Sequence, residues 1–168
     1  DGFQAIFLAT GAPKSRRLGV PGDQLAGVVP ATLFLKRVNL GERPRLQGEV
    51  VVVGGGSTAM DAARSALRSG AEHVTVLYRR ALEDMPAQRE EVEAARAEGV
   101  TVRIGTIVTE VIAADGTAVA IRIAEQAPTA TRERGRVVWE AVPGSDASLN
   151  VNTVLVAVGE EPDPSILP

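Results

Sequence analysis

Three consecutive glycines are followed by small polar residues in the pattern Gly-x-Gly-x-x-Ala, formed by Gly54, Gly55, Gly56, Ser57, Thr58 and Ala59. In this pattern the first glycine permits a tight turn, the second lets a ligand approach the backbone, and the small last residue lets a helix pack closely. Amides at a helix N-terminus bind phosphate, because they are unpaired and the helix dipole is positive there. The spacing predicts a dinucleotide pyrophosphate site; a purely structural turn is the alternative.

A pair of arginines, Arg79 and Arg80, follows the apolar run that begins at Val74. In a dinucleotide-binding fold this strand end meets the adenosine ribose, where NAD-specific sites place a carboxylate that accepts from the 2′-hydroxyl. No carboxylate occurs between Val74 and Arg80. Two guanidinium groups suit a 2′-phosphate instead, so the pair favours NADP(H) over NAD(H). A solvated basic turn is the alternative interpretation.

The residues around the glycines predict the elements that would hold this turn. Four valines, residues 50–53, form a β-branched run typical of a strand buried on both faces. Residues 59–68 favour a helix that Ser57 or Thr58 would cap and Gly70 would end. A strand at 73–78, a charged helix at 88–98 and a strand at 100–104 follow. This alternation implies right-handed crossovers and a parallel sheet.

The pattern changes from Ile107 onward. Two β-rich runs, 107–114 and 118–125, are joined through Asp115-Gly116, which favours a hairpin. We expect a polar loop at 127–135, a further strand at 136–142 that carries the only tryptophan, and a buried strand at 153–158. Nearer the N-terminus we expect a strand at 5–9 and a short packing helix at 30–40. The predicted fold class is α/β, a three-layer Rossmann-like dinucleotide-binding domain with a parallel sheet and a small antiparallel β-meander.

Composition excludes several classes of function. The chain has 168 residues, 45% hydrophobic and 23% charged, with a net charge of −3, which gives no electrostatic case for nucleic acid or membrane partners. It has no apolar run of transmembrane length and no N-terminal signal, so we expect a cytoplasmic protein. Zero cysteines exclude disulfides and thiolate-ligated clusters within this segment, and we expect the single histidine to lie on the surface. We predict no metal site.

Several motifs together resemble the two-dinucleotide flavoproteins. Thr10-Gly11 resembles their alanine-threonine-glycine motif, and residues 153–163 resemble the threonine-led strand that returns to the flavin domain. Residues 54–61, 78–80 and 85–87 resemble the small (beta) subunit of NADPH-dependent glutamate synthase and related oxidoreductases, including the flavin half of dihydropyrimidine dehydrogenase. The resemblance covers essentially the whole chain.

The resemblance implies a fragment of a larger flavoprotein. It implies that 1–12 connects from an FAD domain, 13–48 is a loop and helix linker, 49–158 binds NADP(H), and 159–168 returns to the FAD domain. In that family NADPH reduces FAD, and the electrons leave through iron–sulfur clusters to a partner such as the glutamate synthase large subunit. The implied partners are therefore NADP(H), the FAD domain of the same polypeptide and an iron–sulfur acceptor.

The resemblance also implies roles for individual residues. Residues 54–58 would hold the pyrophosphate with Ala59 packed behind them, Gly159 and Glu160 would lie near the nicotinamide, and Thr10-Gly11 would belong to the incomplete FAD site. Related reductases place another arginine soon after the pair, where this chain has Leu82, Glu83 and Asp84; Arg89 is a candidate to replace it. No catalytic acid or base is assigned, because hydride transfer between cofactors needs none from this segment.

Two alternatives remain at this point. A thioredoxin-reductase-like enzyme shares the nicotinamide domain, but such enzymes carry a Cys-x-x-Cys that this chain lacks. A nucleotide-sensing Rossmann module without redox activity would not need both connecting strands.

Overall fold

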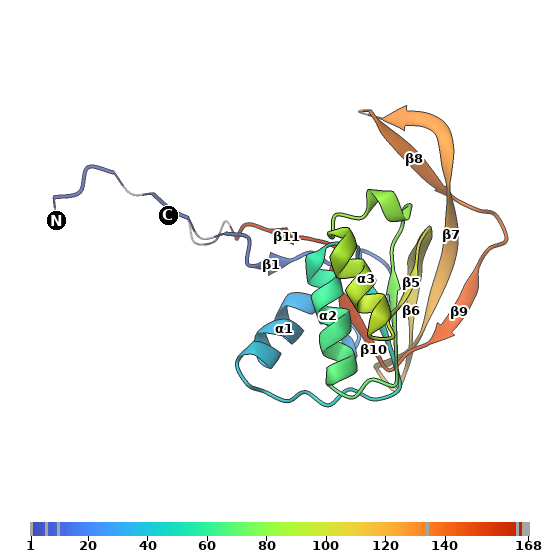
Figure 1. Cartoon of the computed structure of the whole chain (residues 1–168), viewed down its shortest axis with the longest axis horizontal. Coiled ribbons are helices and arrows are strands. Elements are labelled where there is room, and N and C mark those ends of the chain that lie inside the picture. The colour runs from blue at the N-terminus through green and yellow to red at the C-terminus, as the bar shows by residue number, and fades with distance from the viewer. Residues whose placement is uncertain (1, 6, 10, 134, 164, 166–168) are drawn as a thin grey trace.

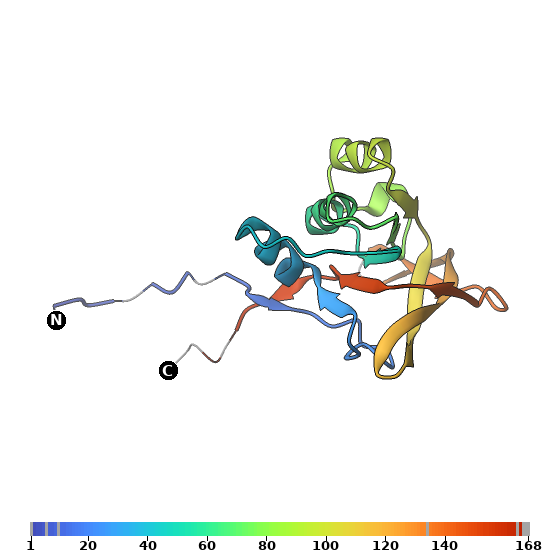
Figure 2. The same ribbon diagram turned by 90° about the horizontal axis from the view of Figure 1, so that it is seen from below.

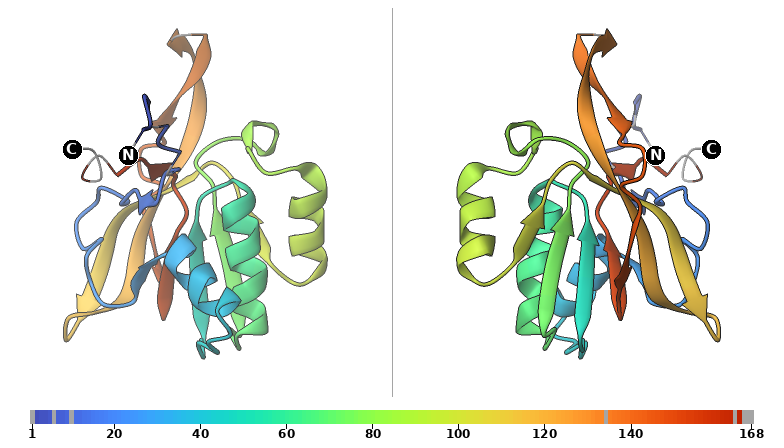
Figure 3. Two further views of the ribbon diagram at one scale, coloured as in Figure 1. Left: turned by 90° about the vertical axis from the view of Figure 1, so that its left-hand side faces the viewer. Right: turned by 90° about the vertical axis from the view of Figure 1, so that its right-hand side faces the viewer.

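A computed structural model describes residues 2–5, 7–9, 11–133, 135–163 and 165. Its centre is a five-stranded parallel sheet with the order β2-β10-β3-β4-β5. The strands are β2 (Val28–Pro30), β3 (Glu49–Val53), β4 (His73–Leu77), β5 (Thr101–Arg103) and β10 (Thr153–Val156). Three helices, α1 (Ala31–Asn39), α2 (Ser57–Arg68) and α3 (Arg89–Ala97), lie along one face of this sheet (Figures 1 and 3).

The other face is covered by an antiparallel sheet, whose yellow and orange strands lie at the right of Figure 2. It contains β6 (Thr106–Ala114), β7 (Thr117–Glu133), β8 (Arg136–Ala141) and β9 (Ala147–Asn150). β6 and β9 both pair with the first half of β7, whereas β8 pairs with its second half. The fold is therefore three layers of α/β structure, as the sequence predicted.

Alternation along the central strand creates two separate cores. Val50 and Val52 pack among the helices, whereas Val51 and Val53 pack against the antiparallel sheet. Because successive strand side chains point to opposite faces, a run of four β-branched residues can fill both cores at once. Four alanines of α2 are fully buried, which lets this helix lie close to the sheet.

Most of the predicted elements are confirmed to within a few residues, but four expectations were wrong. Residues 5 and 7–9 form no strand; Phe7 is 92% exposed, and no neighbouring strand pairs with these residues in the described structure. Ile6 lies outside the described residues. The expected polar loop at 127–135 is instead the distal half of β7 as far as Glu133, because β8 supplies cross-strand partners. The short strands β2 and β9 were missed, as were the two-residue strands at 14–15 and 160–161.

The fourth correction concerns the start of α2. We expected Ser57 or Thr58 to cap this helix, but the N-cap residue is Gly56 and no side chain caps the helix. Ser57 is already the first helical residue. The helix ends as predicted, with Gly70 in a positive-φ conformation immediately after the C-cap residue.

Two short strands join segments that are far apart in sequence. β1 (Lys14–Ser15) pairs antiparallel with β11 (Glu160–Glu161). Lys14 also forms an ion pair with Asp163 at 3.2 Å. The two segments that flank the parallel sheet therefore leave it side by side, on the same side of the domain (Figures 1 and 2).

Candidate functional site

A cleft of about 630 Å³ opens at the carboxyl ends of β3, β4 and β10. This edge of an open parallel sheet is where ligands bind in doubly wound folds. Four arginines and one glutamate supply its charged groups, which makes the cleft suitable for an anion. The lining residues are Arg16, Arg17, Leu18, Val53, Gly54, Gly55, Gly56, Thr58, Leu77, Tyr78, Arg79, Arg80, Pro86, Thr106, Ile107, Val108, Ala157, Val158, Gly159 and Glu160.

Packing explains the first two glycines of the turn. Gly54 has a φ of +152°, and a Cβ atom there would lie 2.3 Å from the carbonyl oxygen of Ala157. A Cβ atom on Gly55 would lie 2.3 Å from the ring of Tyr78. Neither distance is compatible with a side chain, so both residues are glycine because neighbouring strands leave no room.

The third glycine has no such explanation from the protein itself. Gly56 has a φ of −95°, and a Cβ atom there would meet nothing within 4 Å. It lies at the N-terminus of α2, whose first turn contains no acidic residue. Among the described residues, the amides of Gly56, Ser57 and Thr58 donate to no backbone carbonyl. The open space and the free amides fit a bound phosphate group.

Ala59 and Ser57 lie behind this turn and do not line the cleft. Ala59 is completely buried against the sheet, which agrees with its predicted packing role. The Ser57 hydroxyl donates to Glu91 Oε2 at 2.9 Å. The same carboxylate oxygen accepts from the Gln88 amide at 2.8 Å in a capping box that begins α3. Ser57 therefore helps to position α3 beside α2.

A short loop between β4 and α3 is fixed at two points, once to Tyr78 at the end of β4 and once to the glycine turn. The Tyr78 hydroxyl donates to the carbonyl of Asp84 at 2.5 Å, and the Ala87 amide donates to the carbonyl of Gly55 at 3.0 Å. Burial raises the pKa of Tyr78, so its hydroxyl remains a donor at neutral pH. These bonds place Pro86 at the wall of the cleft.

Arg79 and Arg80 follow Tyr78, the first residue after β4, and both line the cleft. Arg89, the third predicted arginine, does not line it. Its Nε atom instead lies 2.8 Å from Glu93 one turn along α3, and this hydrogen bond raises the pKa of the Arg89 guanidinium. The structure thus brings together two of the three predicted arginines.

Gly159 and Glu160 line the opposite end of the cleft, after β10. The Arg16 amide donates to the carbonyl of Gly159 at 2.9 Å, which brings Arg16 and Arg17 to the same wall. Sequence reasoning missed these two arginines because they belong to an irregular loop. The only signal that could have found them is that two basic residues stand next to each other. Gly11 is exposed and does not line the cleft, and Thr10 lies outside the described residues.

Within the described ranges, no group of three histidine or acidic side chains could hold a metal ion. No described helix has the length and apolar character needed to cross a bilayer.

The chain is similar in sequence to several known proteins. The chain is 39% identical to the NADPH-Fe(3+) oxidoreductase subunit beta of Geobacter sulfurreducens, over 99% of this chain and 25% of that protein. It is 38% identical to the glutamate synthase [NADPH] small chain of Halomonas elongata, over 97% of this chain and 36% of that protein. The chain thus spans between a quarter and about a third of these relatives.

A solved structure shares the fold. Mycobacterium tuberculosis FprA in complex with NADPH matches with a TM-score of 0.77 at 18% identity, over 95% of this chain and 50% of that one. The family model described as pyridine nucleotide-disulphide oxidoreductase matches residues 2–167. The chain therefore belongs to the pyridine nucleotide-disulphide oxidoreductase family.

Proposed function

We propose that this chain is the NADPH-binding domain of a flavin-dependent oxidoreductase. The observation that carries the proposal is that the glycine turn and the pair Arg79 and Arg80 line one cleft at the carboxyl edge of the parallel sheet. When bound there, NADPH supplies a hydride. The chain itself binds and orients the nucleotide.

The roles of the residues follow from their positions in the cleft. Gly56 and the first amides of α2 hold the pyrophosphate, because this helix end offers open space and unpaired donors. Arg79 and Arg80 hold the 2′-phosphate, because guanidinium groups bind phosphate oxygens in a bidentate manner. The segment from Val158 to Glu160 lies beside the nicotinamide. Arg89 has no role in this proposal, since its charge is directed to Glu93.

The whole protein passes the reducing equivalents to FAD and onward to iron–sulfur clusters, in the manner of a glutamate synthase small subunit. The named relatives include such a small chain and an NADPH-dependent iron(III) oxidoreductase subunit, which supports this extension. The pairing of β1 with β11 also supports it, because the two connecting segments return to the same place, as an inserted domain requires. The FAD domain, an iron–sulfur acceptor and a cytoplasmic location remain parts of the proposal.

A calorimetric titration with NADPH and, separately, NADH tests the proposal. The wild-type chain should prefer NADPH, and Arg79→Glu should remove that preference. Loss of one charge-assisted hydrogen bond costs about 1.5–3 kcal/mol, or roughly 10-fold to 150-fold in affinity. Arg96→Glu is the matched control, because Arg96 is exposed on α3 and does not line the cleft.

Each outcome decides between candidate functions. Equal binding of NADPH and NADH by the wild-type chain would refute the 2′-phosphate assignment. Binding of neither nucleotide would contradict the proposal and favour a sensing module for another ligand. A thioredoxin-reductase-like function predicts a dithiol within this domain, and the chain contains no cysteine.

A further inference from the structure

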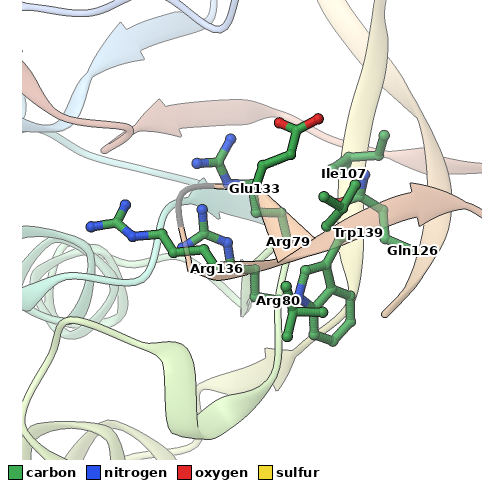
Figure 4. Close-up of a pocket in the computed structure, with 9 residues that line it drawn as sticks. Arg79, Arg80, Ile107, Gln126, Glu133, Arg136 and Trp139 are labelled. Atoms are coloured by element: carbon green, nitrogen blue, oxygen red, sulfur yellow. The ribbon is translucent and has the colours of Figure 1, made fainter. Parts of the chain in front are cut away.

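A second cavity of about 330 Å³ adjoins the cleft beside the hairpin of β7 and β8, which projects from the domain in Figure 1. The two cavities share Arg79, Arg80 and Ile107. Figure 4 shows arginine side chains at one end of the second cavity, with Trp139, Gln126 and Ile107 at the other. Its remaining lining residues come from the hairpin: Glu133, Arg136, Val137 and Val138.

The three arginines of this cavity, Arg79, Arg80 and Arg136, form no ion pair in the described structure. Several described arginines form an ion pair, such as Arg64 with Glu98 at 2.6 Å and Arg103 with Glu125 at 3.4 Å. Within the described ranges, no carboxylate oxygen lies within 4.0 Å of the guanidinium of Arg79, Arg80 or Arg136. Three like charges around one cavity repel each other, and a bound anion would remove that cost.

Glu133 also lines the cavity, as the cross-strand partner of Arg136 in the hairpin. One carboxylate against three guanidinium groups still leaves an excess of positive charge around the cavity. The cavity therefore favours an anionic group that enters from the main cleft, where Arg79 and Arg80 form the shared wall.

We propose that Arg136 is a third guanidinium of the 2′-phosphate site, so that the hairpin of β7 and β8 contributes to the choice of NADP(H) over NAD(H). This inference rests on the proposed function, because it assigns a further residue to the same nucleotide. Arg136 lies 57 residues after Arg79 (136 − 79) and belongs to a different layer of the fold. It reaches the site because β8 pairs with the distal half of β7.

The test uses adenosine 2′,5′-bisphosphate and adenosine 5′-monophosphate as probes, which differ only in the 2′-phosphate. Trp139 is the only tryptophan and lines the cavity, so its fluorescence reports binding there. Arg136→Gln should weaken the bisphosphate about tenfold or more, the effect of one lost charge-assisted hydrogen bond, and should leave the monophosphate unchanged. Arg136→Lys should lose less affinity for the bisphosphate than Arg136→Gln, because lysine keeps the positive charge but not the bidentate geometry.

Arg132→Gln is the matched control, because Arg132 lies on the same hairpin and lines neither cavity. An equal loss in Arg132→Gln would show a general charge effect and overturn the inference. So would an unchanged bisphosphate affinity in Arg136→Gln, or an equal response of Trp139 to inorganic phosphate alone. If Arg79→Gln loses the preference for the bisphosphate while Arg136→Gln keeps it, the proposed function stands and only this inference fails. If the wild-type chain does not distinguish the two probes, both fail.

Discussion

Replacing Gly56 with alanine separates the role of this residue in the fold from its role in the cleft. A Cβ atom at Gly56 meets no protein atom within 4 Å, and the backbone φ of −95° is accessible to alanine. Alanine is a poorer N-cap residue than glycine, which destabilises the fold. It also stabilises the fold by about 0.4–1 kcal/mol, because it lowers the conformational entropy of the unfolded chain. These effects oppose each other, so the free energy of unfolding should change by less than about 1 kcal/mol.

Binding should respond quite differently. The added methyl group would lie where the pyrophosphate approaches the first amides of α2, and overpacking at a close contact costs about 1–3 kcal/mol. NADPH and NADH share the pyrophosphate, so both should bind roughly 5-fold to 150-fold more weakly. Calorimetric titration measures the two affinities, and urea denaturation measures stability.

Gly54→Ala is the contrasting variant in the same turn. Its Cβ atom would lie 2.3 Å from the carbonyl oxygen of Ala157, and its φ is +152°. Overpacking and backbone strain of about 1–3 kcal/mol each predict a loss of about 2–6 kcal/mol in stability. The reasoning is refuted if Gly56→Ala binds NADPH like the wild type, or if it loses as much stability as Gly54→Ala.

Two further predictions concern the elements that support the cleft. Glu98 accepts hydrogen bonds from Arg64 and Arg68 of α2, and the bond from Arg64 is the main reason that the pKa of Glu98 is lowered. Because its folded-state pKa is lowered, the ionised Glu98 carboxylate stabilises the fold above the unfolded pKa of about 4.5, and this contribution is lost as the pH falls through the lower folded pKa. Glu98→Gln should therefore flatten the fall in stability between pH 7 and pH 3, as measured by urea denaturation. An unchanged pH profile would contradict this reasoning. Tyr78→Phe removes the hydrogen bond to the carbonyl of Asp84 and should lower the free energy of unfolding by about 1 kcal/mol, seen as a lower urea midpoint. NADPH binding should also weaken, because the loop that carries the cleft wall is released. A wild-type midpoint would show that this bond contributes nothing to stability.

The parallel sheet could be predicted because its signals are local. The four valines of β3 are a buried strand in any doubly wound context, and the alanines of α2 need only a flat surface to pack against. The strand predicted at residues 5–9 does not form, and the reason is the complementary one. An apolar run becomes a strand only when a neighbour pairs with it, and Phe7 has no such neighbour in the described structure.

The sequence by itself determined the glycine turn, the strand that precedes it, the helix that follows it and the basic character of the end of β4, because each depends on residues within a few positions of one another. Only the tertiary structure decided which charged residues share the cleft. Arg16 and Arg17 reach it because their loop bonds to Gly159, and Arg136 reaches its neighbouring cavity because β7 continues to Glu133. Arg89, closer in sequence, is directed to Glu93 instead, because side-chain direction depends on helix geometry and available partners, which sequence spacing alone does not specify.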